Sequence, residues 1–288
     1  MSGRGADLRA PFYEHDPFLG EGSVISYPPE AHMPGTAVVR LYTGDGFIIA
    51  ADGLRRDLSG AEVSNRQQKI FKIGVAGNLF AYALTGTTYV AQSELGFDVS
   101  LEAANVAATL SLKGYDSPDR YTEQFGRLLR ASFRRGQKDR RIREFSDPGT
   151  SGEQEIVRLL FAGYYGGRPF MSGTTLCHKD QEIQFPTRES RILSPLGTRL
   201  ELSGSEKVRD LLLSTDDDTF AEYRTAGWIK MRIHVPLSLA EGADLARAYI
   251  AACASPKGRT LDVQCAAIGG RVHVAEITPA GFTWIDPP

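Results

Sequence analysis

The chain has 288 residues, of which 42% are hydrophobic and 24% charged, and its formal net charge at pH 7 is −2. This composition is ordinary for a globular protein, and the nearly balanced charge gives no overall attraction to nucleic acid or to an anionic membrane surface. No apolar run approaches the ~20 residues that a membrane-spanning helix needs, so we expect neither nucleic acid nor a membrane as partner.

Cysteine and histidine provide no sign of a metal site. The three cysteines, Cys177, Cys253 and Cys265, are too few and too scattered for a disulfide framework or a zinc cluster. The five histidines stand singly, without the spacing of metal ligands. Because the first thirty residues also lack the apolar segment of a secretory signal, we expect a cytoplasmic protein without metal or cofactor.

The first predicted elements are strands. Residues 1–34 are rich in Gly, Pro and charge and predict an extended leader. From Thr36 onward, TAVVRLYT and GFIIAAD flank a Gly-Asp-Gly turn, the pattern of a β-hairpin. Two more short strands are predicted over Lys69–Ile73 and Leu79–Thr85, and Gly86 ends the second.

Two helices are predicted next. Residues 87–112 have helix-like apolar spacing, and DRYTEQFGRLLRASFRRGQ predicts a second helix with Asp119 as its N-cap. A basic segment at 130–144 follows. Because a single aromatic residue, Phe133, lies among its arginines, a solvated helix end and loop is favoured over a surface for an acidic partner.

Strands return in the last half of the chain. Three strands are predicted for EIVRLLFAGYYGG, RPFMSGTTLC and KDQEIQFPT. A Ser-Gly-Ser turn then precedes a helix, and a second, amphipathic helix is predicted for SLAEGADLARAYIAACAS. The chain closes with a hairpin predicted for GGRVHVAEITPAGFTWI. Runs of strands separated by runs of helices predict an α+β fold in one domain, with helices packed outside antiparallel sheets.

The segment GTAVVRLYTGDGFIIAADGLRRD, followed by QQKIFKIG and ALTG, resembles the opening of the proteasome β-subunit family of the N-terminal-nucleophile (Ntn) hydrolases. In that family a Gly-Thr junction is cut and the threonine becomes the new N-terminus. Thr36 and Asp52 have the spacing of the family, Lys69 matches its lysine one residue late, and Gly86 ends YALTG as the family's glycine does.

Two later motifs continue the resemblance, which covers most of Thr36–Ile285. Ser203 in LSGSEKVRDLL matches the family's Ser-Gly-Ser turn, and Asp262 in GRTLDVQCAAIGG matches its closing aspartate. The chain departs from the pattern at Cys265, where a serine is usual, and at Ala37, where Thr or Ser is usual.

The resemblance implies a domain organisation and a fold. Residues 1–35 correspond to a leader or propeptide, and residues 36–288 to a proteasome-like domain. Its expected architecture is a four-layer αββα sandwich of the Ntn-hydrolase type, in which helices flank two antiparallel sheets.

The chemistry of such a site requires a free N-terminus at Thr36. An α-amino group has an unperturbed pKa near ~7.7–8.0, so the amine freed by cleavage after Gly35 could accept the proton of the Thr36 hydroxyl, and one residue would supply nucleophile and base. A lysine beside the nucleophile, Lys69, would lower the pKa of both groups. Burial of this lysine near another cation would be costly, so it would need a carboxylate partner, and Asp52 is the natural one.

The other matched residues complete the expected site. The backbone N–H of Gly86 is the candidate oxyanion donor, because glycine allows close approach of a substrate. Ser203 and Asp262 would complete the hydrogen bonding around the amine. Each residue also has a structural interpretation: Thr36 as the first residue of a strand, Asp52 as a turn cap, Lys69 as a solvated side chain, Gly86 as a strand end and Ser203 as a helix N-cap.

Three functions remain open from the sequence. The leading prediction is a threonine-type endopeptidase, formed by autocatalytic processing, that cleaves peptide or unfolded-protein substrates through an acyl-enzyme on Thr36 and assembles into a homo-oligomeric ring. A partner ATPase is not identified by the sequence. The alternatives are a non-catalytic, unprocessed proteasome-like structural subunit and an Ntn hydrolase acting on a small amide.

Overall fold

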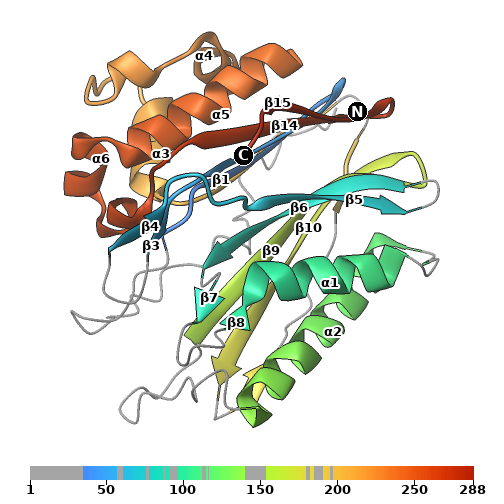
Figure 1. Cartoon of the computed structure of the whole chain (residues 1–288). Coiled ribbons are helices and arrows are strands. Elements are labelled where there is room, and N and C mark those ends of the chain that lie inside the picture. The colour runs from blue at the N-terminus through green and yellow to red at the C-terminus, as the bar shows by residue number, and fades with distance from the viewer. Residues whose placement is uncertain are drawn as a thin grey trace, which may run out of the picture. The chain divides into compact units, whose positions relative to one another are not determined.

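Two antiparallel sheets form the middle of the fold (Figure 1). The structure is a computed structural model, and all described elements lie in the unit His32–Pro288. The described residues are 35–56, 61–75, 78–86, 89–90, 97–111, 115, 117–139, 154–179, 182–184, 191–194 and 197–288.

The first sheet has five strands in the order β13-β1-β2-β14-β15. Their bounds are β1 Val38–Thr43, β2 Gly46–Asp52, β13 Thr198–Ser203, β14 Val272–Thr278 and β15 Gly281–Asp286. The β1–β2 hairpin predicted around the Gly-Asp-Gly turn is confirmed, with Val38 opposite Ala51 and Thr43 opposite Gly46. Both strands are buried along their whole length because they lie inside the sheet.

The second sheet has six strands, with the order β11-β10-β9-β6-β5 and with β12 also paired to β10. Their bounds are β5 Ile70–Val75, β6 Asn78–Gly86, β9 Gln154–Tyr165, β10 Arg168–Lys179, β11 Glu182–Gln184 and β12 Arg191–Ile192. Two small ribbons accompany the sheets, β3 Arg55–Arg56 with β4 Glu62–Ser64 and β7 Tyr89–Val90 with β8 Phe97–Asp98.

Helices cover the outer face of each sheet (Figure 1). Two helices, α1 Val99–Ser111 and α2 Pro118–Lys138, pack on the second sheet. Helix α5 Leu239–Ala254 lies on the first sheet, accompanied by α3 Glu206–Leu213, α4 Ala226–Arg232, α6 Pro256–Leu261 and the 3-10 helices η1 Ala221–Tyr223 and η2 Val263–Ala267. None of the helices described is both long and apolar enough to cross a membrane.

Three apolar clusters hold these layers together. One lies between the second sheet and α1 and α2, one between the first sheet and the helices around α5, and one between the two sheets. The third cluster includes Val38 and Ile49 from the first sheet and Ile70 and Ala83 from the second. Alternate residues of each strand therefore face different clusters, as the two-residue period of a strand requires. The fold is α+β with antiparallel sheets.

Two predicted features differ in the structure. Within 87–112, residues Tyr89–Val90 and Phe97–Asp98 form strands, so α1 begins later than the apolar spacing indicated. The N-cap of α2 is Ser117, not Asp119, because the Ser117 side chain accepts a hydrogen bond from Arg120 N and proline occupies the first turn. The leader 1–34 and the part of the basic segment after residue 139 lie outside the described residues.

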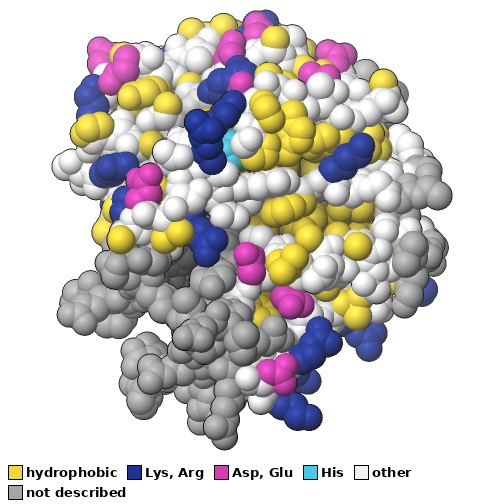
Figure 2. Space-filling model, viewed as in Figure 1, with side chains coloured by type: hydrophobic (Ala, Val, Ile, Leu, Met, Phe, Trp, Pro, Cys, Tyr) yellow, Lys and Arg dark blue, Asp and Glu magenta, His cyan; other side chains and the backbone are white. Residues whose placement is uncertain are grey.

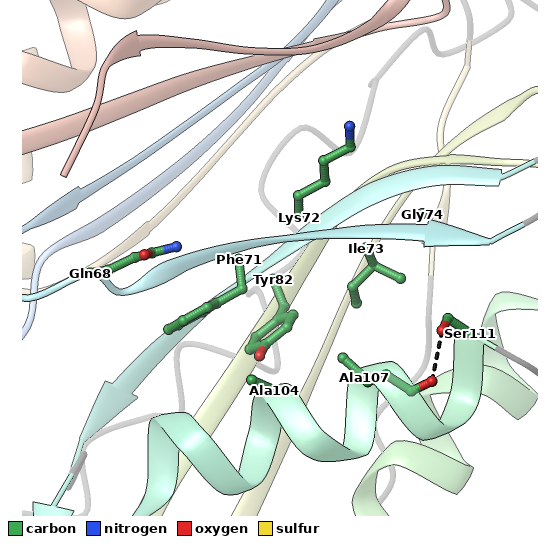
Figure 3. Close-up of a pocket in the computed structure, with 10 residues that line it drawn as sticks. Gln68, Phe71, Lys72, Ile73, Gly74, Tyr82, Ala104, Ala107 and Ser111 are labelled. Carbon is green, nitrogen blue, oxygen red and sulfur yellow. Dashed lines mark hydrogen bonds between the residues drawn. The ribbon is translucent and has the colours of Figure 1, made fainter.

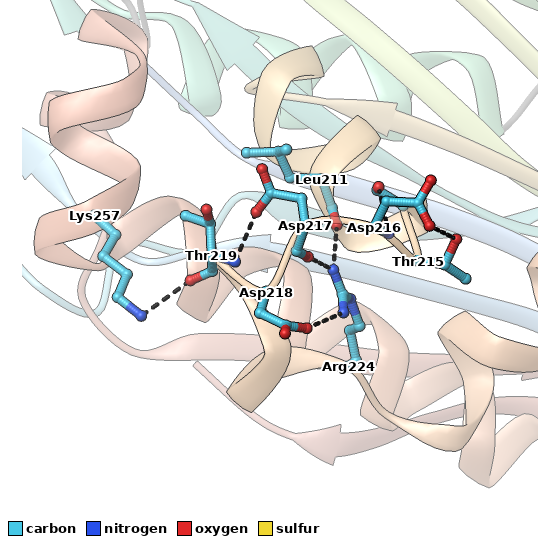
Figure 4. Close-up of polar contacts among 9 residues, drawn as sticks. Leu211, Thr215, Asp216, Asp217, Asp218, Thr219, Arg224 and Lys257 are labelled. Carbon is cyan, nitrogen blue, oxygen red and sulfur yellow. Dashed lines mark hydrogen bonds and ion pairs between the residues drawn. The ribbon is translucent and has the colours of Figure 1, made fainter.

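The acidic run between α3 and η1 is part of a hydrogen-bonded loop (Figure 4). Arg224 donates to the carbonyl of Leu211 at 3.1 Å and to Asp218 Oδ1 at 3.3 Å, and it also bonds the carbonyl of Asp217. The Asp217 carboxylate accepts the backbone N–H of Thr219 at 2.7 Å. These carboxylates therefore shape a loop.

Candidate active site

Thr36, Asp52 and Lys69 meet in one buried cluster. Lys69 Nζ lies 3.3 Å from Thr36 Oγ1 and 3.0 Å from Asp52 Oδ1. All three side chains are nearly inaccessible to solvent, with exposures of 6% for Thr36, 0% for Asp52 and 2% for Lys69. One ammonium thus bridges a hydroxyl and a carboxylate in a region from which water is largely excluded.

The three residues come from the ends of three strands. Thr36 precedes β1, Asp52 is the last residue of β2, and Lys69 immediately precedes β5. Because β1 and β2 belong to the first sheet and β5 to the second, the Lys69 side chain reaches across from one sheet to the other. The cluster therefore depends on the packing of the two sheets.

The Asp52 carboxylate is fully used by its neighbours. Its Oδ1 accepts Ala37 N at 3.0 Å as well as Lys69, and its Oδ2 accepts Gly269 N at 3.2 Å and Leu54 N at 3.3 Å. Burial raises the pKa of Asp52 above its ordinary value, and the charge of Lys69 acts in the opposite direction. Through Ala37 N, the carboxylate also fixes the backbone next to Thr36.

Gly35 fits tightly before Thr36. A Cβ at this position would lie 2.5 Å from Ala267 Cβ and 2.5 Å from the carbonyl oxygen of Gln264, both in η2. Such distances leave no room for a side chain, so the backbone itself packs against η2. This accounts for the glycine of the Gly35-Thr36 pair, while cleavage of the bond stays a prediction.

The serine that bonds Asp262 is Ser205 and not Ser203. Ser205 Oγ donates to Asp262 Oδ2 at 2.7 Å and accepts Val208 N at 3.2 Å as the N-cap of α3. Ser203 is the last residue of β13 and lies opposite Val38 on β1. In the sequence, either serine of the Ser-Gly-Ser turn could be the N-cap of the helix that follows. In the structure α3 begins at Glu206, directly after Ser205, so Ser205 is the N-cap.

Ser205 and Asp262 lie on segments that border the residues around Thr36. Gly204, next to Ser205, has the Ala37 Cα 3.5 Å from the place of a Cβ. Asp262 caps η2, whose Gln264 and Ala267 contact Gly35. The Ser205–Asp262 pair is thereby brought to the same end of the first sheet as Thr36.

Cys265 occupies a buried position beside this pair. It is fully inaccessible to solvent and is a free thiol, as is Cys253 on α5. A hydrogen bond with Cys265, together with burial, raises the pKa of Cys253. The thiol of Cys265 also contacts Ser205, so the residue that replaces the family's usual serine belongs to the same polar group.

His273 is a neighbour of the cluster that the sequence did not single out. It lies on β14 opposite Ala51, is fully buried, and neither ring nitrogen has a hydrogen-bond partner among the described residues. Burial, with the nearby charges of Arg271 and Lys69, lowers the pKa of His273 to about 4. The imidazole is therefore neutral at pH 7.

Gly86 ends β6 at the side of the sheet where Lys69 lies. Leu84 N donates to the Lys69 carbonyl at 3.0 Å, and Gly86 follows two residues later. Its φ is +89°, and a Cβ would lie 2.6 Å from the carbonyl oxygen of Ile156, so the position requires glycine. Its role as an oxyanion donor stays a prediction.

Within the described ranges, no group of three or more His, Cys, Asp or Glu side chains could hold a metal ion. The chemistry available to the cluster is that of a hydroxyl beside a buried ammonium. Such a charge favours the deprotonated hydroxyl, and a low-dielectric surrounding strengthens the effect. The arrangement suits nucleophilic attack by Thr36.

Comparison with protein-family models and with curated proteins gave no match. Among solved structures, the chain is similar to a Gly-1 mutant of Anbu from Hyphomicrobium sp. strain MC1, with a TM-score of 0.46 and 12% sequence identity. The likeness covers 88% of this chain and 88% of that one. It is too distant to assign a function.

Proposed function

We propose that the chain is a threonine-type amide hydrolase of the Ntn class, with Thr36 as nucleophile after removal of residues 1–35. The observation that supports this most directly is the contact of Lys69 Nζ with both Thr36 Oγ1 and Asp52 Oδ1, at 3.3 and 3.0 Å, in a buried cluster. A buried hydroxyl with a merely structural role needs no ammonium beside it.

Each residue of the cluster has a role in this proposal. The amine freed at Thr36 takes the hydroxyl proton, and the oxygen attacks the substrate carbonyl. The amide C–N bond then breaks, the leaving amine takes that proton from the Thr36 ammonium, and water hydrolyses the acyl-enzyme to release the carboxylic acid and regenerate Thr36. Lys69 stabilises the alkoxide, and Asp52 holds Lys69 in place. Ser205 and Asp262 bind the amine, and the N–H of Gly86 stabilises the oxyanion.

The fold and assembly follow from the same proposal. The order of helices, first sheet, second sheet and helices is assigned to the four-layer sandwich of Ntn hydrolases. Residues 1–35 act as a propeptide that leaves Thr36 blocked until processing, and peptides are the substrate class, hydrolysed within a homo-oligomeric ring.

The intact mass and N-terminal sequence of the purified protein test the proposal together with the turnover of a fluorogenic peptide. We expect a chain that begins at Thr36 and hydrolyses the peptide. Thr36→Ala should remain unprocessed and lose at least about a thousandfold in rate, as expected for loss of a nucleophile.

Thr43→Ala is the matched control, since Thr43 is a fully buried threonine at the far end of β1. It should be processed and active. A wild-type chain that keeps residues 1–35 in its assembled form has no free amine at Thr36, and this result would favour the non-catalytic subunit. Turnover of small amides but not of peptides would instead favour the small-amide hydrolase.

A further inference from the structure

The outer edge of β5 is open along the described part of the chain. β5 ends the second sheet and pairs with β6 alone among the described strands. Leu84 N donates to the Lys69 carbonyl, so in the antiparallel alternation Phe71 and Ile73 bond β6. The backbone groups of Lys72 and Gly74 then point outward.

The side chain of Gln68 supports this reading of the edge. Its Nε2 donates to the carbonyl of Ile70 at 2.9 Å, which is the first outward-pointing carbonyl of the strand. The carbonyl at the start of the edge is thus satisfied, whereas no described strand pairs with the outward groups of Lys72 and Gly74. A Cβ at Gly74, which would point to a face of the sheet, would have no atom of the described structure within 4 Å.

A pocket of ≈ 330 Å³ lies beside this edge, between the second sheet and α1 (Figure 3). Phe71, Ile73 and Tyr82 point from the sheet toward α1, whereas Lys72 points to the other side of the sheet. The wall from α1 consists of small residues, which leave the space open. They are Ala104, Ala107, Ala108 and Ser111.

The pocket is apolar but contains one unused donor. Phe71 stacks on Tyr82 with ring centroids 5.1 Å apart, and the two rings form one wall. The hydroxyl of Tyr82 is buried and has no hydrogen-bond partner among the described residues. A buried hydroxyl without a partner is costly, and the ring that carries it borders the pocket.

Apolar surface continues from β5 to the edge strand of the first sheet. Phe282 and Trp284 on β15 are half-buried and pack against each other at 5.2 Å, and Lys72 Nζ lies 5.9 Å from the Phe282 ring centroid. Figure 2 shows apolar side chains gathered on this face of the molecule. A chain lying along β5 would therefore meet apolar side chains on both sides.

We propose that the edge of β5 binds an extended peptide as an added strand, with a large apolar side chain of that peptide in the α1 pocket. Backbone hydrogen bonds to Lys72 and Gly74 supply affinity, and the pocket supplies selectivity. Acidic residues are rejected because Lys72, the one cation among the lining residues, directs its side chain to the other side of the sheet.

The position of β5 relates this peptide to the candidate active site. β5 starts directly after Lys69, so a peptide paired with it runs toward Thr36, and Gly74 lies roughly 16 Å from Lys69 at ~3.3 Å per residue. The inference rests on the proposed function in one respect, since it takes the bound peptide to be the substrate. Binding itself does not depend on cleavage.

Binding is measured on the full-length Thr36→Ala protein, so that cleavage does not interfere. The probe is a fluorescein-labelled eight-residue peptide of Ser and Thr with one central Leu, followed by fluorescence anisotropy. We expect saturable binding, and at least tenfold weaker binding when the Leu is replaced by Asp.

Two variant pairs separate the pocket from the edge. Ala107→Trp fills the pocket, whereas Asn105→Trp adds the same ring at an exposed position of α1 outside it. Gly74→Pro removes an outward N–H, whereas Gly74→Ala keeps it and places a methyl group in open space. Ala107→Trp and Gly74→Pro should each weaken binding at least tenfold, and the two controls less than twofold.

Equal binding of the Leu and Asp peptides, or of each variant and its control, would overturn the proposal. The proposal would also be overturned if the edge pairs with a second copy of the chain instead of a peptide. In that case the protein would form an oligomer that binds no peptide and that Gly74→Pro dissociates. Turnover of a fluorogenic peptide by the protein with intact Thr36 separates the two ideas. Binding without turnover contradicts the proposed function alone, and turnover without binding contradicts this inference alone.

Discussion

At the scale of single residues, Lys69 and Asp52 form a buried ion pair whose parts depend on each other. Lys69→Met removes the ammonium beside Thr36 and leaves the Asp52 charge buried without its counterion. Loss of one partner of such a pair costs about 3–5 kcal/mol in stability, and we expect peptide turnover to disappear. Thermal denaturation and a turnover assay measure the two effects.

The double variant Lys69→Met/Asp52→Asn separates stability from catalysis. A neutral amide at position 52 carries no charge to be buried, but it keeps a single acceptor oxygen, which can serve either Ala37 N or Gly269 N and not both. The double variant should regain part of the lost stability but no activity. Turnover at the wild-type rate in either variant would show that Lys69 does not activate Thr36.

The lowered pKa of buried His273 predicts that the protein loses stability in acid. Its pKa is about 4 in the folded chain and near ~6.5 when unfolded, so the unfolded state binds more protons between these values. The free energy of unfolding should therefore fall as pH drops from about 6.5 to 4, by about 3 kcal/mol from this group, and no further below pH 4. Urea denaturation at a series of pH values measures the slope.

His273→Leu is the control for that slope. The change removes the titrating group and the two unpaired ring nitrogens. Leucine suits the position, because His273 lies two residues from Ala275 on β14 and so shares its face, which packs in the apolar cluster between the sheets. The variant should lose stability less steeply over the same pH range. An unchanged slope would mean that other groups, such as the carboxylates, account for the acid sensitivity.

At the scale of elements, the Ser-Gly-Ser turn predicts different effects for its two serines. Ser205→Ala removes the N-cap of α3 and the bond to Asp262, and it should cost about 2 kcal/mol. Ser203→Ala should change stability by less than about 0.5 kcal/mol. Chemical denaturation compares the two, and a larger cost at Ser203 would contradict the assignment of Ser205 to the polar group.

The elements that could be predicted are those with a strong local pattern. The β1–β2 hairpin and α5 follow from alternation and from a 3.6-residue period, and the capping box of Ser238 and Glu241 marks the start of α5. The start of α1 could not be found this way. A short β7–β8 ribbon precedes it, and two-residue strands are too short to show a period.

At the scale of the whole molecule, the site was predicted from order and spacing along the chain, because Thr36, Asp52 and Lys69 are matched one by one to a family pattern. Propensity alone could not bring them together, since Lys69 reaches the other two across the space between the sheets. His273 shows the converse limit. Its alternation in VHVAEIT places it on a buried face, but no local signal says that Lys69 lies nearby.

Arg40, which lies at the contact between the two sheets, gives the last prediction on stability. Arg40 on β1 pairs with Glu201 on β13 and donates across to the second sheet, to the carbonyls of Phe161 at 2.9 Å and Ser172 at 2.6 Å. Its exposure is 3%. Replacement by methionine removes the donor to two buried carbonyls and the nearest counterion of Glu201, a loss of about 3–5 kcal/mol.

Arg199→Met provides the comparison for Arg40→Met, because Arg199, on β13 of the same sheet, also pairs with Glu201, at 3.2 Å, but is about one-third exposed. Exposed pairs contribute little, so we expect a loss below about 1 kcal/mol. Urea denaturation followed both by Trp fluorescence and by peptide turnover would also show whether activity is lost at the same urea concentration at which the sheets unfold. Since Lys69 and Thr36 stand on opposite sheets, Arg40→Met should lose activity at a lower urea concentration than the wild type, in parallel with its unfolding. Equal midpoints for the Arg40 and Arg199 variants would mean that packing between the sheets does not need this ion pair.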